Sequence, residues 1–142
     1  MLVRDVLAKK GRNVVTVGPE LPVLDAVRVL VEYNIGAVLV TDRGTLVGIL
    51  SERDVLRLTA KGPEMVAGTS VGDAMTTDLV VGLPTDDVSY AMAVMTNNRV
   101  RHLPILDDDL VGIVSIGDLV NATLTSLEAE NRWLRDYVQG GG

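Results

Sequence analysis

The chain has 142 residues, enough for one domain with a buried core or for two small fused units. Hydrophobic residues make up 47% and charged residues 23%, a balance typical of a globular rather than a disordered protein. With 13 basic and 19 acidic residues the net charge is −6, which disfavours nucleic-acid binding. The absence of cysteine excludes disulfides, thiolate catalysis and sulfur-ligated metal sites.

Charge begins at Arg4, and no run of about 18 apolar residues occurs, so the sequence predicts neither a signal peptide nor a membrane span. The lack of cysteine fits a cytoplasmic location. Aromatic residues account for only 3% of the chain. A site for a flat heterocycle would therefore have to hold it mostly with aliphatic side chains and backbone groups.

The first half begins with a short helical turn over residues 3–7 and a brief β segment over residues 14–17. An amphipathic helix follows, with Pro22 expected at its first position, where a helix tolerates proline. Its apolar residues recur at helical spacing: Val23, Ala26, Val27, Leu30 and Val31. Two β-rich runs within residues 36–50 then suit a hairpin, and a helix opens at Ser51.

The same order returns after residues 61–70, whose Gly and Pro residues are typical of a linker. A helical turn over residues 71–75 matches residues 3–7, and a second β segment is expected over residues 79–81. Such self-similarity indicates an internal repeat.

The second amphipathic helix has Thr85 and Asp86 as candidate N-caps. A hairpin over residues 101–114 matches the earlier one, and a helix again opens at Ser115. Between its two β runs stands Asp107-Asp108-Asp109, which could suggest a cation site. A calcium loop needs more ligands at wider spacing, so we interpret this run as a solvated turn.

The sequence therefore predicts an α/β protein: two repeats, each about β-α-β-β-α with a preceding helical turn, packed with pseudo-twofold symmetry, plus a C-terminal helix. Neither half would bury enough surface to be comfortable alone. The expected boundaries are repeat 1 at 1–60, a linker at 61–70, repeat 2 at 71–122, and a C-terminal helix with a frayed glycine end at 123–142.

Each repeat carries a Ser-x-x-Asp motif where a β run meets a helix. The unpaired N–H groups and the positive dipole end at such a junction favour a phosphate. The aspartates, Asp54 and Asp118, can each accept hydrogen bonds from a ribose 2′,3′-diol, worth about 1.5–3 kcal/mol apiece. The same pattern is also a capping box. Alone it favours capping, whereas its repetition favours a ligand.

The doubled order resembles the cystathionine β-synthase (CBS) domain family over residues 1 to about 122. The resemblance rests on Val-x-Asp-Val/Ala-Leu/Met, an Arg-His-x-Pro-Ile-like strand and Val-Gly-Ile-x-Ser-x-x-Asp, the last seen at Val47–Asp54 and Val111–Asp118. Two such domains in tandem form a Bateman module. The resemblance implies a disc-like, often dimeric unit whose clefts bind adenosine-containing ligands such as AMP, ADP, ATP, NAD or S-adenosylmethionine.

In that family the Asp of one repeat works with the early strands of the other, so the resemblance implies two clefts. Cleft one combines Ser51, Arg53, Asp54, Val80, Val100, Arg101 and His102. Cleft two combines Thr16, Ile35, Gly36, Ala37, Ser115 and Asp118.

The two predicted clefts differ in charge. Cleft one has Arg53, Arg101 and His102, enough positive charge to hold phosphate on an acidic chain, whereas Gly117 replaces the arginine in the second motif. We expect cleft one to bind a phosphorylated nucleotide and cleft two to bind weakly, to take adenosine alone or to stay empty. The alternative for the arginines is pairing with surface carboxylates. His102, the sole histidine, is either a phosphate contact or a structural residue.

The end of the sequence continues the helical pattern. Apolar residues alternate at spacings of four and three, as in a coiled-coil seam, with Asn131 where a buried Asn would fix the register: Val120, Leu124, Leu127, Asn131, Leu134 and Val138. The seam spans under three heptads, so it would be marginal alone. Two interpretations remain open: contact with a second copy, or an amphipathic helix folded back on its own core.

The sequence predicts a stand-alone, non-enzymatic sensor of adenine nucleotides, because no nucleophile or acid/base pair is visible. Its expected partners are an adenine nucleotide, a second copy of the chain and an unidentified effector protein, with no nucleic acid, membrane, metal or catalytic cofactor. The competing hypothesis is a structural or protein-interaction module whose clefts bind nothing.

Overall fold

The computed structural model describes residues 1–11 and 14–140. Its elements follow the predicted α/β order. The first part contains α1 (Val3–Lys10), β1 (Thr16–Val17), α2 (Val23–Tyr33), β2 (Ala37–Asp42), β3 (Thr45–Ser51), α3 (Glu52–Ala60) and α4 (Glu64–Gly68). The second contains α5 (Val71–Ala74), α6 (Val88–Asn98), β4 (His102–Asp107), β5 (Asp109–Ser115) and α7 (Ile116–Gly140).

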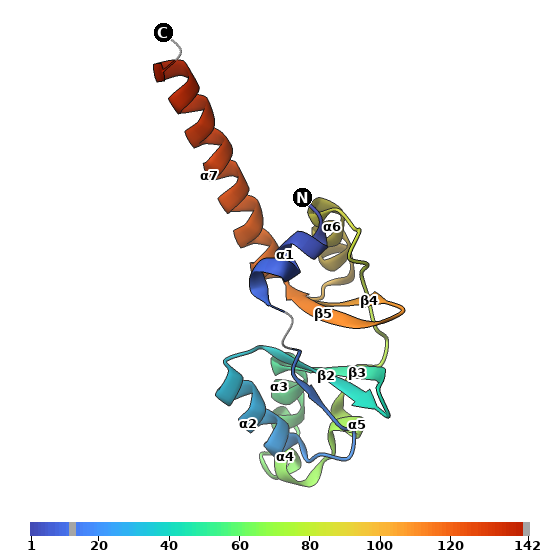
Figure 1. Cartoon of the computed structure of the whole chain (residues 1–142). Coiled ribbons are helices and arrows are strands. Elements are labelled where there is room, and N and C mark those ends of the chain that lie inside the picture. The colour runs from blue at the N-terminus through green and yellow to red at the C-terminus, as the bar shows by residue number, and fades with distance from the viewer. Residues whose placement is uncertain (12–13, 141–142) are drawn as a thin grey trace. The chain divides into compact units, whose positions relative to one another are not determined.

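The chain forms two compact units, and these do not coincide with the two sequence repeats (Figure 1). The central unit runs from Val14 to Val80 and includes Asp108–Leu110. The terminal unit contains α1, Val81–Asp107 and the chain from Val111 onward. The leading helix of each repeat therefore belongs to the unit built by the other repeat: α1 to the terminal unit and α5 to the central unit.

The exchange of leading helices has a steric basis in two equivalent glycines. A Cβ on Gly48, in β3, would overlap the Met75 side chain that follows α5. A Cβ on Gly112, in β5, would come within 2.8 Å of Cδ2 of Leu7, in α1. The glycine of each Val-Gly-Ile segment thus lets one apolar side chain of the other repeat's leading segment, Leu7 or Met75, lie directly on the strand.

The central unit is built on a three-stranded sheet in the order β1-β2-β3, with β1 parallel and β3 antiparallel to β2. Arg43 and Gly44 both have positive φ in the β2–β3 turn, as a tight two-residue hairpin turn requires. Buried residues from the sheet, α2, α3 and α5 form one core: Val17, Val23, Ala26, Leu30, Val38, Val40, Leu50, Leu58 and Val71.

The terminal unit has a two-stranded sheet of β4 and β5. The β segment expected over residues 79–81 is wrong, because strand pairing begins only at Gly82, which bridges Ile105 in parallel. Proline explains the difference. In the central unit, Leu39 N donates to Val15 O, but the equivalent residue in β4 is Pro104, which has no N–H to donate.

Helix starts differ slightly from the expected positions. Pro22 is the N-cap of α2 rather than its first residue. The N-cap of α6 is Asp87, whose carboxylate accepts a hydrogen bond from Ser89 N at 2.9 Å, not Thr85 or Asp86. Asp86 instead accepts from Leu83 N at 2.8 Å and closes the preceding turn.

Two further segments depart from a simple repeat. The expected linker, residues 61–70, contains the short helix α4. The last helix of repeat 2 and the C-terminal helix form the continuous 25-residue α7, which Figure 1 shows extending from the terminal unit. The expected frayed glycine end falls partly on Gly141 and Gly142, outside the described residues. Among the residues described, no helix is long and apolar enough to cross a membrane.

Candidate functional site

The Ser-x-x-Asp motif of the central unit lies at the junction of β3 and α3. Ser51 is the N-cap of α3, and its Oγ accepts a hydrogen bond from Asp54 N at 3.3 Å. In return, Oδ2 of Asp54 accepts from Ser51 N at 2.9 Å and from Ser51 Oγ at 3.0 Å. The motif therefore forms the capping box that the sequence allowed, and it fixes the carboxylate at the helix N-terminus.

Asp54 has a further partner that the sequence did not indicate. Thr76 Oγ1 donates to Oδ1 of Asp54 at 3.1 Å. Asp54 is only 9% exposed, and it is the buried charged residue of the described chain. Three donors on a carboxylate with about four acceptor positions leave one position for a further donor.

The motif of the terminal unit lies between β5 and α7 and makes the same reciprocal bonds. Asp118 N donates to Ser115 Oγ at 3.0 Å, and Ser115 N donates to Oδ2 of Asp118 at 2.8 Å. Here Lys10, at the end of α1, takes the place of a hydroxyl partner. Its Nζ lies 2.6 Å from Oδ2 of Asp118 and 3.1 Å from Ile113 O.

The charge of Asp118 follows from these contacts. Burial is the largest single influence and disfavours the ionised form. The hydrogen bonds from Lys10 and Ser115, together with the Lys10 charge, outweigh burial, so the pKa of Asp118 is lowered from its ordinary 3.8. Asp118 is therefore a carboxylate held ionised by a lysine, a feature that cleft two was not expected to have.

The first residues of the hairpin strands lie next to the motif of their own repeat. In the central unit, Ala37 pairs with Ser51, and Glu52 N donates to Gly36 O at 3.0 Å. In the terminal unit, Ile116 N donates to Arg101 O at 2.9 Å. Each unit thus brings the start of one strand to the N-terminus of the motif helix.

This grouping differs from the composition of the predicted clefts. The central unit holds Ser51, Arg53, Asp54 and Val80 of cleft one, and Thr16, Ile35, Gly36 and Ala37 of cleft two. The terminal unit holds Val100, Arg101 and His102 of cleft one, and Ser115 and Asp118 of cleft two. The assembly of each cleft from both units stays a prediction.

The two candidate phosphate-binding arginines are exposed. Among the described residues, the salt bridges are Lys10–Asp118 and Arg28–Asp25, so neither Arg53 nor Arg101 pairs with a surface carboxylate there. Half-buried His102 opens β4 directly after Arg101.

Other parts of the described chain are weaker candidates for a functional site than the two Ser-x-x-Asp junctions. A shallow depression of about 390 Å³ in the central unit is lined by the end of α2 and the start of α3, and Ile35 is its only predicted site residue. Neither Ser51 nor Asp54 lines it. No group of three or more His, Cys, Asp or Glu side chains in the described part of the chain could hold a metal ion.

Comparison with known proteins finds the same family in both repeats. The family model of the CBS domain matches residues 3–61 and 71–125. The chain is 36% identical to the CBS domain-containing protein CBSX3, mitochondrial, of Arabidopsis thaliana, over 98% of this chain and 72% of that protein. It is 40% identical to the CBS domain-containing protein YhcV of Bacillus subtilis, over 75% of this chain and 76% of that protein.

Solved structures agree in fold. The CBS-domain containing protein ATU1752 from Agrobacterium tumefaciens has a TM-score of 0.83 and 40% identity, covering 87% of this chain and 99% of that one. The CBS domain pair of protein MJ0100, solved in complex with 5′-methylthioadenosine and S-adenosyl-L-methionine, has a TM-score of 0.78 and 22% identity, covering 89% and 98%. The chain therefore belongs to the CBS-domain family and carries a tandem pair of these regulatory domains.

Proposed function

We propose that the chain is a non-catalytic regulatory module that binds an adenosine-containing ligand, with AMP, ADP or ATP as the first candidates and NAD or S-adenosylmethionine as others. The observation that carries the proposal is the doubled junction in which a Ser-x-x-Asp motif caps a helix beside the start of a β-strand. The ligands of the MJ0100 domain pair, which has the same fold, both contain adenosine.

The junctions supply two kinds of contact. The N-termini of α3 and α7 offer their positive dipole ends to a phosphate, although the first and third N–H groups of each helix already donate within the protein. Asp54 offers the one acceptor position that its three donors leave, and Asp118 offers its capped carboxylate, to a ribose hydroxyl. An adenine ring would lie between aliphatic side chains such as Val80 and Val100, because the chain has few aromatic residues.

The clefts are not equal in this proposal. Cleft one, with Asp54 and the exposed Arg53 and Arg101, is proposed to take the phosphorylated nucleotide. In cleft two, Gly117 stands at the position of Arg53, so the motif lacks that charge for a phosphate, and the charge of Lys10 is already paired with Asp118. This supports weaker binding in cleft two.

A thermal-shift panel of AMP, ADP, ATP, NAD and S-adenosylmethionine tests the proposal. A ligand that binds only the folded state adds about 2.7 kcal/mol of stability at a hundredfold excess over its Kd. We expect a rise in Tm with at least one nucleotide. Asp54→Ala should abolish this rise, and Asp118→Ala should reduce it by a smaller amount.

Each variant is compared with its own ligand-free Tm, and Asp54→Asn repeats the test with the side-chain volume kept. Asp73→Ala is the matched control, because Ser70 and Asp73 form a Ser-x-x-Asp pattern at the short helix α5, where no strand precedes it. A shift that survives Asp54→Ala but not Asp118→Ala would reverse the order of the clefts.

The second candidate is a protein-interaction module with unoccupied clefts. It is favoured by the capping bonds and by the Lys10 contact, which already engage both carboxylates within the protein. No shift with any panel member at millimolar concentration would select it. In either case we expect the module to act in the cytoplasm, as a homodimer, on a separate effector protein.

A further inference from the structure

Most of α7 lies outside the packed part of the terminal unit. Leu119, at the end of its first turn, is fully buried, and Thr123 is half-buried, but every residue from Leu124 to Gln139 is exposed. Figure 1 shows the helix extending from the unit. The alternative in which this helix folds back on its own core is therefore wrong beyond Thr123. An exposed helix of this length needs some other source of stability, because most helical stability comes from packing an apolar face.

The exposed part carries the apolar seam that the sequence predicted. Leu124 and Leu127 are about half exposed, Leu134 is 46% exposed and Val138 is 75% exposed. Their alternating spacing of three and four places Leu124, Asn131 and Val138 at a positions and Leu127 and Leu134 at d positions of a heptad. The helix is already nucleated in the terminal unit, so the seam needs only a partner helix.

For two fully overlapping copies of the helix, charge favours one direction. Beside the seam, Glu130 occupies a g position and Arg135 the following e position. In a parallel, in-register pair of identical helices, Glu130 of each copy faces Arg135 of the other. In the antiparallel pair with full overlap, Glu130 faces Glu130 and Glu128 faces Glu128, which repels.

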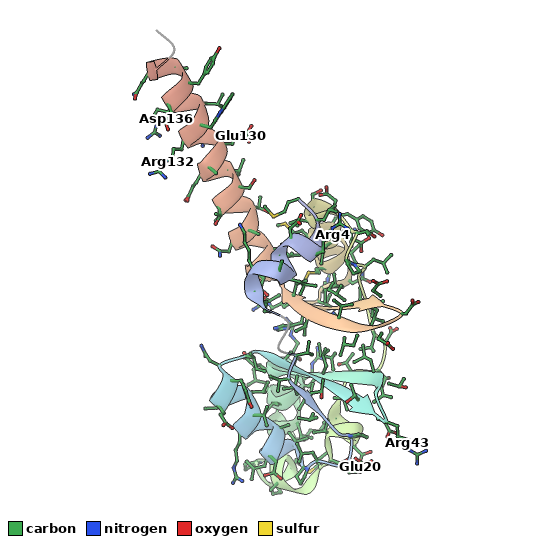
Figure 2. The ribbon with its side chains drawn as sticks, viewed as in Figure 1. Arg4, Glu20, Arg43, Glu130, Arg132 and Asp136 are labelled. Atoms are coloured by element: carbon green, nitrogen blue, oxygen red, sulfur yellow. The ribbon has the colours of Figure 1, made fainter. Side chains whose placement is uncertain are left out.

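We propose that α7 forms a parallel, in-register two-stranded coiled coil with α7 of a second copy of this chain. Asn131 then faces its own equivalent, and such a buried pair fixes register and strand number. Figure 2 shows Glu130 on the opposite side of α7 from Arg132 and Asp136, which lie at b and f positions and stay in solvent. Trp133 and Tyr137 stack on each other with ring centroids 5.6 Å apart, Trp133 at a c position and Tyr137 beside the seam at g.

Cysteine cross-linking tests the direction directly, because the chain has no natural cysteine. In the proposed geometry, Leu134→Cys lies opposite itself and forms a disulfide-linked dimer under mild oxidation. In the antiparallel pair with full overlap, residue 134 faces residue 124, and the two 134 positions lie about 15 Å apart along the axis, beyond disulfide reach. Asp136→Cys is the matched control and is expected to stay monomeric on a denaturing gel.

A charge swap gives an independent test at Glu130 and Arg135, which are exposed and lie outside the packed part of the unit. Arg135→Glu places like charges opposite each other twice per dimer and is expected to raise the dimer Kd about tenfold. The double variant Glu130→Arg/Arg135→Glu restores attraction and is expected to restore the wild-type Kd. Arg132→Glu, outside the seam, is expected to leave it unchanged.

Sedimentation of the whole chain measures the oligomeric state of these variants without any ligand. The outcome is therefore independent of the proposed nucleotide binding. We expect the wild-type mass to be twice 15.2 kDa and that of Leu134→Glu to be 15.2 kDa. A monomeric wild-type chain at the highest concentration reached, a Leu134→Glu variant that remains dimeric, or failure of the double variant to rescue would each overturn the proposal.

Discussion

Asp54 and Asp118 cap their helices in the same way but differ in the third group that reaches the carboxylate. The capping bonds were predictable because Ser and Asp are three residues apart. The third groups were not, because Thr76 is 22 residues and Lys10 is 108 residues from its partner. Lys10 ends the leading helix Val3–Lys10, and Thr76 follows the leading helix Val71–Ala74; each such helix belongs to the unit of the other repeat. The repeat was visible in the sequence, but the exchange of the leading helices between the two units was not.

Lys10→Met tests the role of the lysine at Asp118. The pKa of Asp118 is lower in the folded chain than its ordinary 3.8, so the contact stabilises the protein above that pH and is lost as pH falls through the folded pKa. Both side chains are partly exposed, so the variant should lose at most about 1 kcal/mol near neutral pH. The loss should vanish in acid.

Urea denaturation of the wild type and Lys10→Met, from neutral pH down to about pH 3, measures this difference. Lys9→Met is the matched control, because Lys9 also lies in the last turn of α1 and makes no hydrogen bond among the described residues. A deficit specific to Lys10→Met that persists or grows in acid would contradict the assigned contact.

Thr76→Val removes the hydroxyl that donates to Oδ1 of Asp54 while keeping the side chain's shape. Because Asp54 is only 9% exposed, the lost hydrogen bond should cost about 1 kcal/mol in the free energy of unfolding. The neighbouring Thr77→Val removes a hydroxyl without a hydrogen bond in the described chain and should have little effect. Equal urea midpoints for the two variants would show that the Thr76 bond adds no stability.

At the scale of elements, a proline without a backbone N–H and a glycine without a side chain explain the main departures from a simple repeat. Pro104 removes one parallel pairing bond, so the terminal unit has a bridge at Gly82 where the central unit has β1. Hydrophobic periodicity predicted α2, α6 and both hairpins. It could not show that one β segment lacks its pairing bond, because that depends on a residue more than twenty positions away.

Gly48→Ala tests the close approach of α5 to β3. The new Cβ would overlap Sδ of Met75, lie 2.9 Å from its Cγ and lie 3.1 Å from Thr76 O, which accepts the Ile49 N–H. Because a backbone oxygen cannot move away as easily as a side chain, we expect a loss of about 1–3 kcal/mol and a lower Tm.

Gly68→Ala is the control for this variant. Its Cβ would meet nothing within 4 Å, and the residue is helical in α4, so the substitution should be neutral or stabilise the fold by up to about 1 kcal/mol. Differential scanning calorimetry compares the two. If Gly48→Ala melted at or above the wild-type temperature, the glycine would not be needed for the packing of Met75.

At the scale of the whole molecule, the repeat predicted two similar units and the family, but not how the chain is shared between them. Repetition in a sequence shows that two segments adopt similar structures and leaves open which copies pack together. The C-terminal helix was predicted from the spacing of its apolar residues. Choosing between its two interpretations, contact with a second copy or folding back on its own core, required the exposed fractions of those residues. Those fractions leave the outer part of α7 with no packing partner among the described residues of its own unit.

The outer part of α7 should therefore be helical only when a second copy covers it. A helix segment of about 16 residues without tertiary contacts is marginal in water, so dilution below the dimer Kd should open the hydrogen bonds of residues 124–139. Amide hydrogen exchange measured at high and low chain concentration should show protection of this segment only at high concentration. Leu134→Glu should abolish that protection at every concentration, whereas α2 and α6 should exchange as in the wild type. Slow exchange of residues 124–139 in a monomeric Leu134→Glu variant would mean that α7 is stable on its own, and the need for a partner helix would disappear.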